Sequence, residues 1–148
     1  MNVIELQEEL IQLLDNNYAS EHILSEYKDK ASSSYFKDYL QECSIFFREL
    51  GDHLYLALAV EGIKMDFRTV HGGQSERPWI DNISLRQTLT DHEILEVVLE
   101  GHSKAVSDME AVLENKVLPY DLAMVIEKGL MVLKGLIGHV HSLADLSK

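Results

Sequence analysis

The sequence predicts an all-α protein in which four long helices pack side by side in one bundle. Four stretches place apolar residues three and four positions apart, which puts them on one face of a helix. The chain has only two prolines among its 148 residues, so little in it interrupts a long helix. This length suffices for one hydrophobic core and is too short for two ordinary domains, which predicts a single domain over 1–148.

The first helix is predicted over about residues 3–31. Asn2 followed by Glu5 is typical of a helix start, where a capping side chain precedes an acid by three residues. One face of this helix collects Val3, Leu6, Leu10, Leu13, Leu14, Asn17, Glu21 and Leu24. Three serines at 32–34 then break the pattern, and their hydroxyls can cap the next helix.

The second helix is predicted over about residues 35–65. Its apolar face consists of Phe36, Tyr39, Cys43, Phe46, Phe47, Leu50, Leu54 and Leu58. Because so few residues connect it to the first helix, the two are expected to be antiparallel. The periodicity then fails over a linker of about 66–89, which contains the turn signals Gly72-Gly73 and Pro78. This linker is long enough to cross the bundle, so the second and third helices can run parallel.

The third helix is predicted over about residues 90–115. It begins with Thr90 and Glu93, the pattern of a capping box. Its apolar face carries Ile94, Val98, His102, Ala105, Met109 and Val112. The fourth helix is predicted over about 119–146, with Pro119 at its first position, where the missing N–H of proline costs nothing.

The connections between these helices predict their topology. A short connection joins the helices of each pair, and a long one joins the two pairs, which describes a ferritin-like four-helix bundle with a long crossover between helices 2 and 3. The first and third helices are then antiparallel neighbours. Glycines at 129, 135 and 138 of the fourth helix are interpreted as points where a neighbouring helix comes close.

Two inward-facing polar side chains are the strongest functional signal in the helix patterns. Glu21 falls inside the apolar face of the first helix, and His102 falls inside that of the third. At 1.5 Å of rise per residue, both come to a similar height in the predicted bundle. A buried carboxylate is costly unless it is paired, so the two are expected to meet across the core. Such a pair would raise the pKa of the histidine, and it is either structural or part of a metal site.

The metal hypothesis includes further residues along the second helix. The candidate ligands are Glu21, Glu42, Glu49, His53 and His102. A ferritin-type di-iron centre uses Glu-x-x-His motifs, and this chain contains none; Glu49 and His53 are four residues apart instead of three. The sequence therefore predicts no complete di-iron centre and no catalytic residue. The remaining metal hypothesis is one degenerate site for iron, manganese or zinc.

Charge and composition exclude several classes of protein. The formal net charge is −12, which argues against nucleic acid or an anionic membrane as a partner. No apolar run approaches the ~20 residues of a membrane span, and no signal segment is recognised, which predicts a cytoplasmic protein. The single cysteine, Cys43, excludes an intramolecular disulfide and is interpreted as a core residue. Trp79 is expected to plug one end of the bundle.

Several stretches of the chain resemble a bacterial ferritin-like family, domain of unknown function 2383. The stretches in the second half are Trp79–Leu85, Leu89–Leu95, Glu100–Ala105, Met109–Leu113 and Leu118–Pro119. Those in the first half are Leu13–Asn17, leading to Glu21, and Phe47–Leu50. The resemblance covers most of the chain and implies a ferritin-like bundle from a family without an established activity. That family typically has Glu after the glycine of the third helix, where this chain has His102, which weakens the case for carboxylate ligation.

Two hypotheses on function follow. The first is a non-catalytic structural or interaction protein that acts through its surface, as a homodimer or with another protein partner. The second is a metal-binding ferritin-like protein with a carboxylate and histidine site in the bundle core. Fold alone cannot decide between them, because helical bundles support many unrelated functions.

Overall fold

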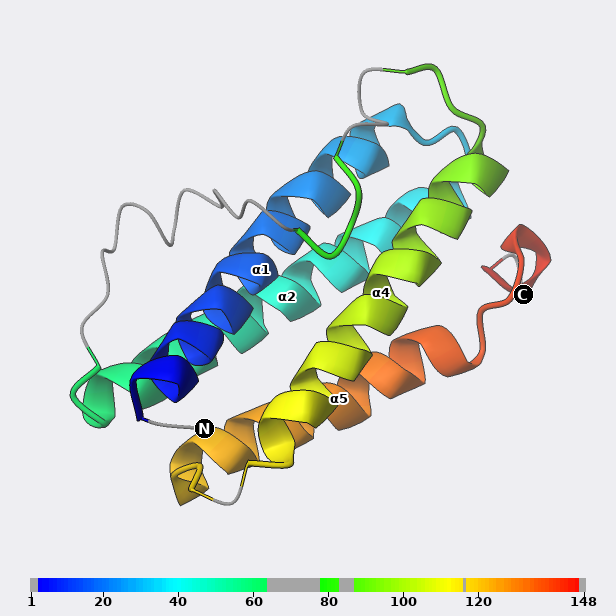
Figure 1. Ribbon diagram of the computed structural model, residues 1–148. Coiled ribbons are helices and arrows are strands. Elements are labelled where there is room, and N and C mark those ends of the chain that lie inside the picture. The colour runs from blue at the N-terminus through cyan, green and yellow to red at the C-terminus, as the bar shows by residue number, and fades with distance from the viewer. Residues whose placement is uncertain (1–2, 64–77, 83–86, 116, 147–148) are drawn as a thin grey trace.

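The computed structural model describes residues 3–63, 78–82, 87–115 and 117–146. Within these ranges the chain forms helices and connecting turns and no strand, which confirms the all-α prediction (Figure 1). The elements are the helices α1 (Val3–Lys30), α2 (Ser34–Val60), α4 (Asp91–Leu113) and α5 (Tyr120–Gly138) and the short 3-10 helix η2 (Leu143–Leu146).

Each of the four long helices packs against two others. α1 contacts α2 and α4, and α5 contacts the same two helices from the opposite side. The carboxylate of Asp91, at the start of α4, accepts hydrogen bonds from the backbone N–H groups of Ser32 and Ser33 at 2.8 and 2.9 Å. Because Ser33 directly precedes α2, the helices α2 and α4 begin at the same end of the bundle, as Figure 1 shows.

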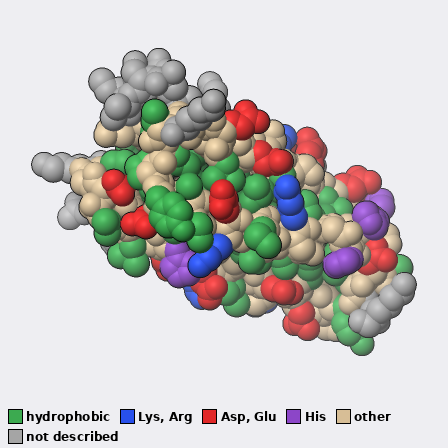
Figure 2. All heavy atoms as spheres, turned by 90° about the horizontal axis from the view of Figure 1, so that it is seen from below, with side chains coloured by type: hydrophobic (Ala, Val, Ile, Leu, Met, Phe, Trp, Pro, Cys, Tyr) green, Lys and Arg blue, Asp and Glu red, His purple; other side chains and the backbone are tan. Residues whose placement is uncertain are grey.

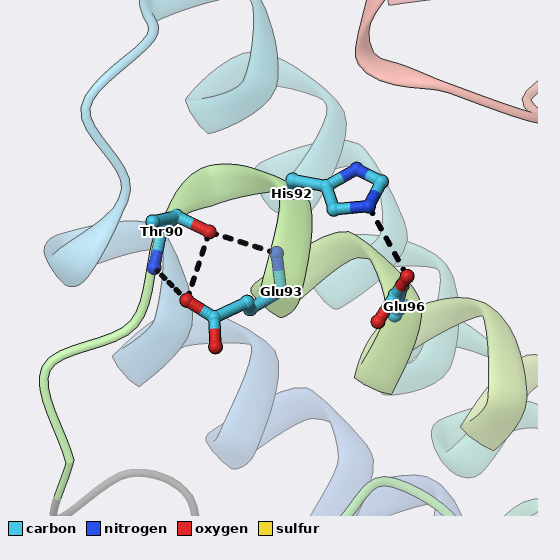
Figure 3. Close-up of polar contacts among 4 residues, drawn as sticks. All are labelled: Thr90, His92, Glu93 and Glu96. Carbon is cyan, nitrogen blue, oxygen red and sulfur yellow. Dashed lines mark hydrogen bonds and ion pairs between the residues drawn. The ribbon is translucent and has the colours of Figure 1, made fainter.

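Two of the predicted helix caps are confirmed. The hydroxyl of Ser33 accepts a hydrogen bond from the backbone N–H of Phe36 and caps α2. Thr90 and Glu93 form a complete capping box at the start of α4, where the pKa of Glu93 is lowered by hydrogen bonds from the backbone and the hydroxyl of Thr90 (Figure 3). The predicted cap of the first helix, at Asn2 and Glu5, lies outside the residues whose side chains are described.

The end of the second helix was predicted about five residues too late. α2 ends at Val60, because Gly62 adopts φ +77°, a conformation that is costly for every residue except glycine. The backbone N–H of Gly62 bonds the carbonyl of Ala59, and that of Ile63 bonds the carbonyl of Leu58. These two bonds are those of a Schellman motif, which satisfies the last carbonyls of a helix and turns the chain away from its axis.

The bounds of the fourth helix were also predicted too wide. Pro119 is the residue before α5, with an extended ψ of 144°, and the helix begins at Tyr120. At the other end α5 stops at Gly138 instead of continuing to 146. The carboxylate of Asp145 accepts from two backbone N–H groups, those of His141 and Ser142. These bonds replace helical ones and hold the chain in a turn before η2, which packs against α2 and α4.

The prediction that Trp79 plugs the end of the bundle is wrong. Trp79 lies against the middle of α2 and the second half of α4: its ring centre is 5.8 Å from that of Phe47, and its indole N–H donates to Asp108 at 2.7 Å. Figure 1 shows the segment 78–82 entering between α1 and α4. Among the four pairs of neighbouring helices, α1 and α4 are packed most loosely, so this side of the bundle has room for a large aromatic ring.

Candidate functional site

His102 lies in the middle of α4 and is completely buried. Its ring centre is 5.6 Å from that of Phe47, which reaches it from α2 across the core. Among the described residues, neither ring nitrogen has a hydrogen-bond partner. Burial lowers the pKa of His102 to about 4, because the charged imidazolium would lose its hydration without gaining a counter-charge. The site therefore holds a neutral histidine.

The predicted pairing of Glu21 with His102 is wrong, and so is the predicted rise of the histidine pKa. Glu21 is half-buried on α1, and its backbone carbonyl accepts from the hydroxyl of Ser44 on α2. The segment 78–82 enters between α1 and α4 next to the histidine, since Ile80 packs against Gly101. The prediction did not foresee that Trp79 and Ile80 of the linker would pack against α4 at Gly101, next to His102.

Two further polar residues of α1 are buried. Asn17 and Ser20 are fully buried, and within the described part of the chain the Asn17 Oδ1 and Ser20 Oγ atoms have no hydrogen-bond partner. Asn16 and Asp108 line one groove between α1 and α4, which sets the register of these antiparallel helices. Counting along each helix from that groove brings Ser20 within about one turn of His102. Sequence reasoning missed Ser20, although it is three residues from Asn17 on the same helix face.

The other three metal candidates lie on the surface of α2. Glu49 and His53 line a groove between α2 and α5, whereas Glu42 is exposed on the helix outside this groove. The five predicted ligands are therefore divided between the core, the α1 margin and the α2 surface. In the part of the chain that the structure describes, no three His, Cys, Asp or Glu side chains come close enough to hold one ion.

The groove between α2 and α5, which we call the α2/α5 groove, has a volume of about 380 Å³ and is mainly apolar. Its lining consists of Phe46, Glu49, Leu50, His53, Met124, Val125, Lys128, Gly129 and Val132. At its floor the two helices come close, because a Cβ added to Gly129 would lie 2.6 Å from the Leu50 Cδ1 atom. The predicted close approach is confirmed at Gly129 and wrong at Gly135 and Gly138, where an added Cβ meets no described atom within 4 Å.

Large apolar side chains are also exposed on the two helices that form the groove, and one of them, Val132, lines the groove itself. Leu56 and Val60 on α2 and Met131 and Val132 on α5 are each more than half exposed. Figure 2 views the molecule from the side on which α5 lies and shows hydrophobic patches reaching the surface between acidic side chains. None of these four residues belongs to an apolar face predicted from the sequence. The sequence did contain a signal for this surface, because these apolar residues occupy helix positions that point away from the bundle core.

Cys43 is confirmed as a core residue. The thiol is buried in α2, and burial raises its pKa to about 12. At neutral pH it is a thiol rather than the reactive thiolate. The cysteine therefore adds nothing to the chemistry of the α2/α5 groove.

None of the helices in the described ranges is long and apolar enough to cross a membrane. Comparison with family models, with curated proteins and with solved structures finds no match to this chain.

Proposed function

We propose that this chain is a non-catalytic interaction protein that binds a protein partner through the α2/α5 groove. The observation that carries the proposal is the apolar surface that the two helices leave uncovered. It combines an apolar groove with the exposed side chains of Leu56, Val60, Met131 and Val132. Burying one such side chain fully contributes roughly 1.5–3 kcal/mol, so covering several of them favours association.

The composition of this surface is typical of a binding interface. Interfaces combine a water-excluding apolar centre with a polar rim that orients the partner. Here Phe46 and Leu50 supply apolar lining, while Glu49, His53 and Lys128 supply the polar groups. Only two of the five predicted metal ligands lie in this groove, which favours recognition of a partner surface over metal chemistry.

We also propose that the bundle is ferritin-like, with a crossover between α2 and α4 through the linker at about 66–89. Two observations support this topology: α2 and α4 begin at the same end, and each helix packs against two antiparallel neighbours. Membership of the family called domain of unknown function 2383 is part of this proposal and rests on the sequence resemblance. A cytoplasmic location is proposed from the single cysteine of the sequence, Cys43, which is a buried free thiol.

The experiment that tests the function places a photo-crosslinking amino acid at Val132, beside the groove. A matched control places the same amino acid at Ser103, an exposed position on α4. In the cells that make the protein, crosslinks to protein are expected at position 132 in several-fold excess over position 103. Equal yields at the two positions would overturn the proposal, because the apolar surface would then attract no partner.

The metal-binding alternative is favoured by one observation, the fully buried His102 ring. Its two nitrogens have no hydrogen-bond partner among the described residues, and a neutral imidazole is the form that binds metals. An interaction protein is expected to purify with far less than one iron, manganese or zinc per chain when no chelator is used. Stoichiometric metal that is lost in His102→Ala, and retained in the surface variant His22→Ala, would replace the proposed function by the alternative.

A further inference from the structure

We infer that the partner of the α2/α5 groove is a second copy of this chain, related to the first by a two-fold axis that runs along the groove. The inference rests on the proposed function, since it names the occupant of the same surface. It follows from the register of the two helices, from the charges that face each other across the groove, and from the net charge of the chain.

Two contacts and the lining of the groove set the register between α2 and α5. Leu50 packs on Gly129, and Phe46 and Val132 line the same groove one turn further along. Towards the end of α5, the Tyr39 hydroxyl donates to the Leu136 carbonyl at 3.0 Å. Each step forward on α2 is therefore matched by a step back on α5, as in any antiparallel pair. Each residue of α2 along the groove therefore has a counterpart on α5 at about the same height.

This register places an acid opposite a base. Glu49 precedes Leu50 on α2, and Lys128 precedes Gly129 on α5, so the two charged residues are within about 3 Å of the same height. Both line the groove, one from each side. The surface therefore carries a negative group on its α2 side and a positive group on its α5 side, at one level.

A two-fold axis along the groove exchanges these two sides. In a face-to-face pair it lays α2 of one copy over α5 of the other, without changing the height of any residue. Glu49 of each copy then faces Lys128 of the other, so one acid and one base in the sequence produce two opposite-charge pairs. A closed two-fold interface uses the same patch on both subunits, and this patch is complementary to itself.

The same operation covers the exposed apolar residues. Leu56 lies on the α2 side at the height where α5 begins, so it faces the exposed Tyr120 of the other copy. The exposed Val132 similarly faces the α2 helix of the other copy near Phe46, which is only partly buried. Gly135 has no described atom within 4 Å of an added Cβ, so it leaves α5 open to a close approach. The second copy thus buries apolar surface that a single copy leaves in water.

The net charge limits where two copies can meet. The chain carries −12, so most pairs of faces repel each other. The α2/α5 groove is lined by one acid, one base and one histidine, and is close to neutral. Two copies therefore associate there at a lower electrostatic cost than on the acidic remainder of the surface.

Sedimentation velocity of the purified chain tests the inference through charge reversal. The wild-type protein is expected to shift from its 16.8 kDa monomer to twice that mass as its concentration rises to about 100 μM. Glu49→Lys and Lys128→Glu each turn both cross-pairs into like-charge pairs and are expected to weaken self-association about ten-fold or more. The control Lys134→Glu reverses a lysine that pairs with Glu110 of α4, away from the groove, and is expected to leave dimerisation unchanged.

A mixture of the two reversed variants provides the sharpest result. When Glu49→Lys is mixed with Lys128→Glu, both cross-pairs are again opposite in charge, so heterodimers are expected to form with close to wild-type affinity. An interface elsewhere, or a general effect of net charge on stability, does not predict this rescue of each variant by the other. A wild-type chain that stays monomeric, or dimers indifferent to both substitutions, would overturn the inference.

The crosslinking experiment separates this inference from the proposed function. Crosslinks from position 132 to a different protein, from a chain that is monomeric when purified, would overturn the second copy as occupant and support the function. Crosslinked species of twice the chain mass support both. Crosslinks no more frequent than at position 103 overturn both.

Discussion

His102 is a histidine held where its charged form is unstable. The ring is fully buried against Phe47, and its nitrogens have no hydrogen-bond partner among the residues described. An unpaired buried polar group costs about 1–3 kcal/mol, so this residue lowers the stability of the fold even when it is neutral. Protonation adds the further cost of burying a charge without a counter-charge.

This burial predicts a loss of stability in acid. Because the pKa of His102 is about 4 in the fold and 6.5 in an unfolded chain, the unfolded state binds the proton first as the pH falls. Above pH 6.5 the ring is neutral in both states and does not change the free energy of unfolding with pH. Toward pH 4 its protonation in the unfolded state lowers that free energy progressively, by up to about 3 kcal/mol. Urea unfolding between these pH values should show a shallower decline in free energy for His102→Leu than for wild type.

The control for this prediction is an exposed histidine. His22 lies on the surface of α1, where it pairs with Glu26 at 2.9 Å. His22→Leu leaves the buried His102 ring in place, so the decline in stability that this ring causes should remain. If His102→Leu declined as steeply as wild type, the ring would have to be open to water.

At the scale of elements, the segment 78–82 packs between α1 and α4, where the prediction expected contacts between the helices alone. It closes the bundle between α1 and α4, where Tyr27 of α1 donates to the carbonyl of Asp81 at 2.7 Å. On the other side Ile80 and Trp79 press on Gly101 of α4. A stretch without periodicity thus supplies core residues, Trp79 and Ile80, to the side of the bundle where α1 and α4 meet.

Gly101→Ala tests how closely this segment packs. An added Cβ would lie 2.9 Å from both the Ile80 Cα and the Trp79 carbonyl oxygen, and backbone atoms cannot move aside as a side chain can. The expected cost is about 1–3 kcal/mol of unfolding free energy. A change in the emission of Trp79, the sole tryptophan, should accompany it.

The comparison for this variant is Gly135→Ala in α5. No described atom lies within 4 Å of its added Cβ, so the substitution should gain up to about 1 kcal/mol in dilute protein through higher helix propensity. A neutral Gly101→Ala, with unchanged emission, would contradict the close packing of segment 78–82 against α4.

Asp91 joins two elements at one end of the bundle. Its carboxylate accepts from the backbone N–H groups of Ser32 and Ser33, and it stands in the first turn of α4, where negative charge is favourable. Asp91→Ala is therefore expected to lower the unfolding free energy by about 1 kcal/mol more than Asp121→Ala. Asp121 is the matched control because it occupies the first turn of α5 and is exposed. Equal losses in chemical denaturation would show that the contact with the loop contributes nothing.

At the scale of the whole molecule, acidic charge dominates. A net charge of −12 on 148 residues makes the folded chain repel itself. Salt screens repulsion between exposed charges over distances beyond about 10 Å at 0.1 M. Raising sodium chloride from about 0.02 to 0.5 M at pH 7 should therefore raise the thermal midpoint of unfolding by a few degrees.

Raising sodium chloride over the same range near pH 4.9 is the control for this effect. The sequence is close to electrical neutrality there, so little net repulsion remains for salt to screen. The rise in the thermal midpoint should shrink accordingly. An equal rise at both pH values would indicate a salt effect on hydrophobic burial instead of screening.

The local features of this fold were predictable because they depend on residues close in sequence. The spacing of apolar residues predicted all four helices, and the hydroxyl of Thr90 with the acid of Glu93 predicted the start of α4. The ends were less predictable. Gly62 ends α2 by adopting a left-handed conformation. The sequence did not predict this end, because it contains several glycines and no pattern distinguished Gly62 from the others.

The candidate site depended on contacts between distant parts of the chain, and here the predictions failed. Periodicity correctly buried His102, since burial follows from its position on α4. It could not predict that Glu21 would make no hydrogen bond to this ring, because that depends on how remote segments pack around it. Nor could it show that Glu49 would share a groove with Lys128, which is about eighty residues away.

The sequence by itself determined the helices, the caps of α2 and α4 and the burial of a histidine, because each follows from side chains within a few turns of one another. Only the tertiary structure decided that Trp79 enters between α1 and α4, that the histidine lacks the acid it was expected to meet, and that α2 and α5 leave an apolar groove open. The reason is physical: the lateral packing of helices depends on how shapes from remote segments fit together, and no local pattern encodes that fit.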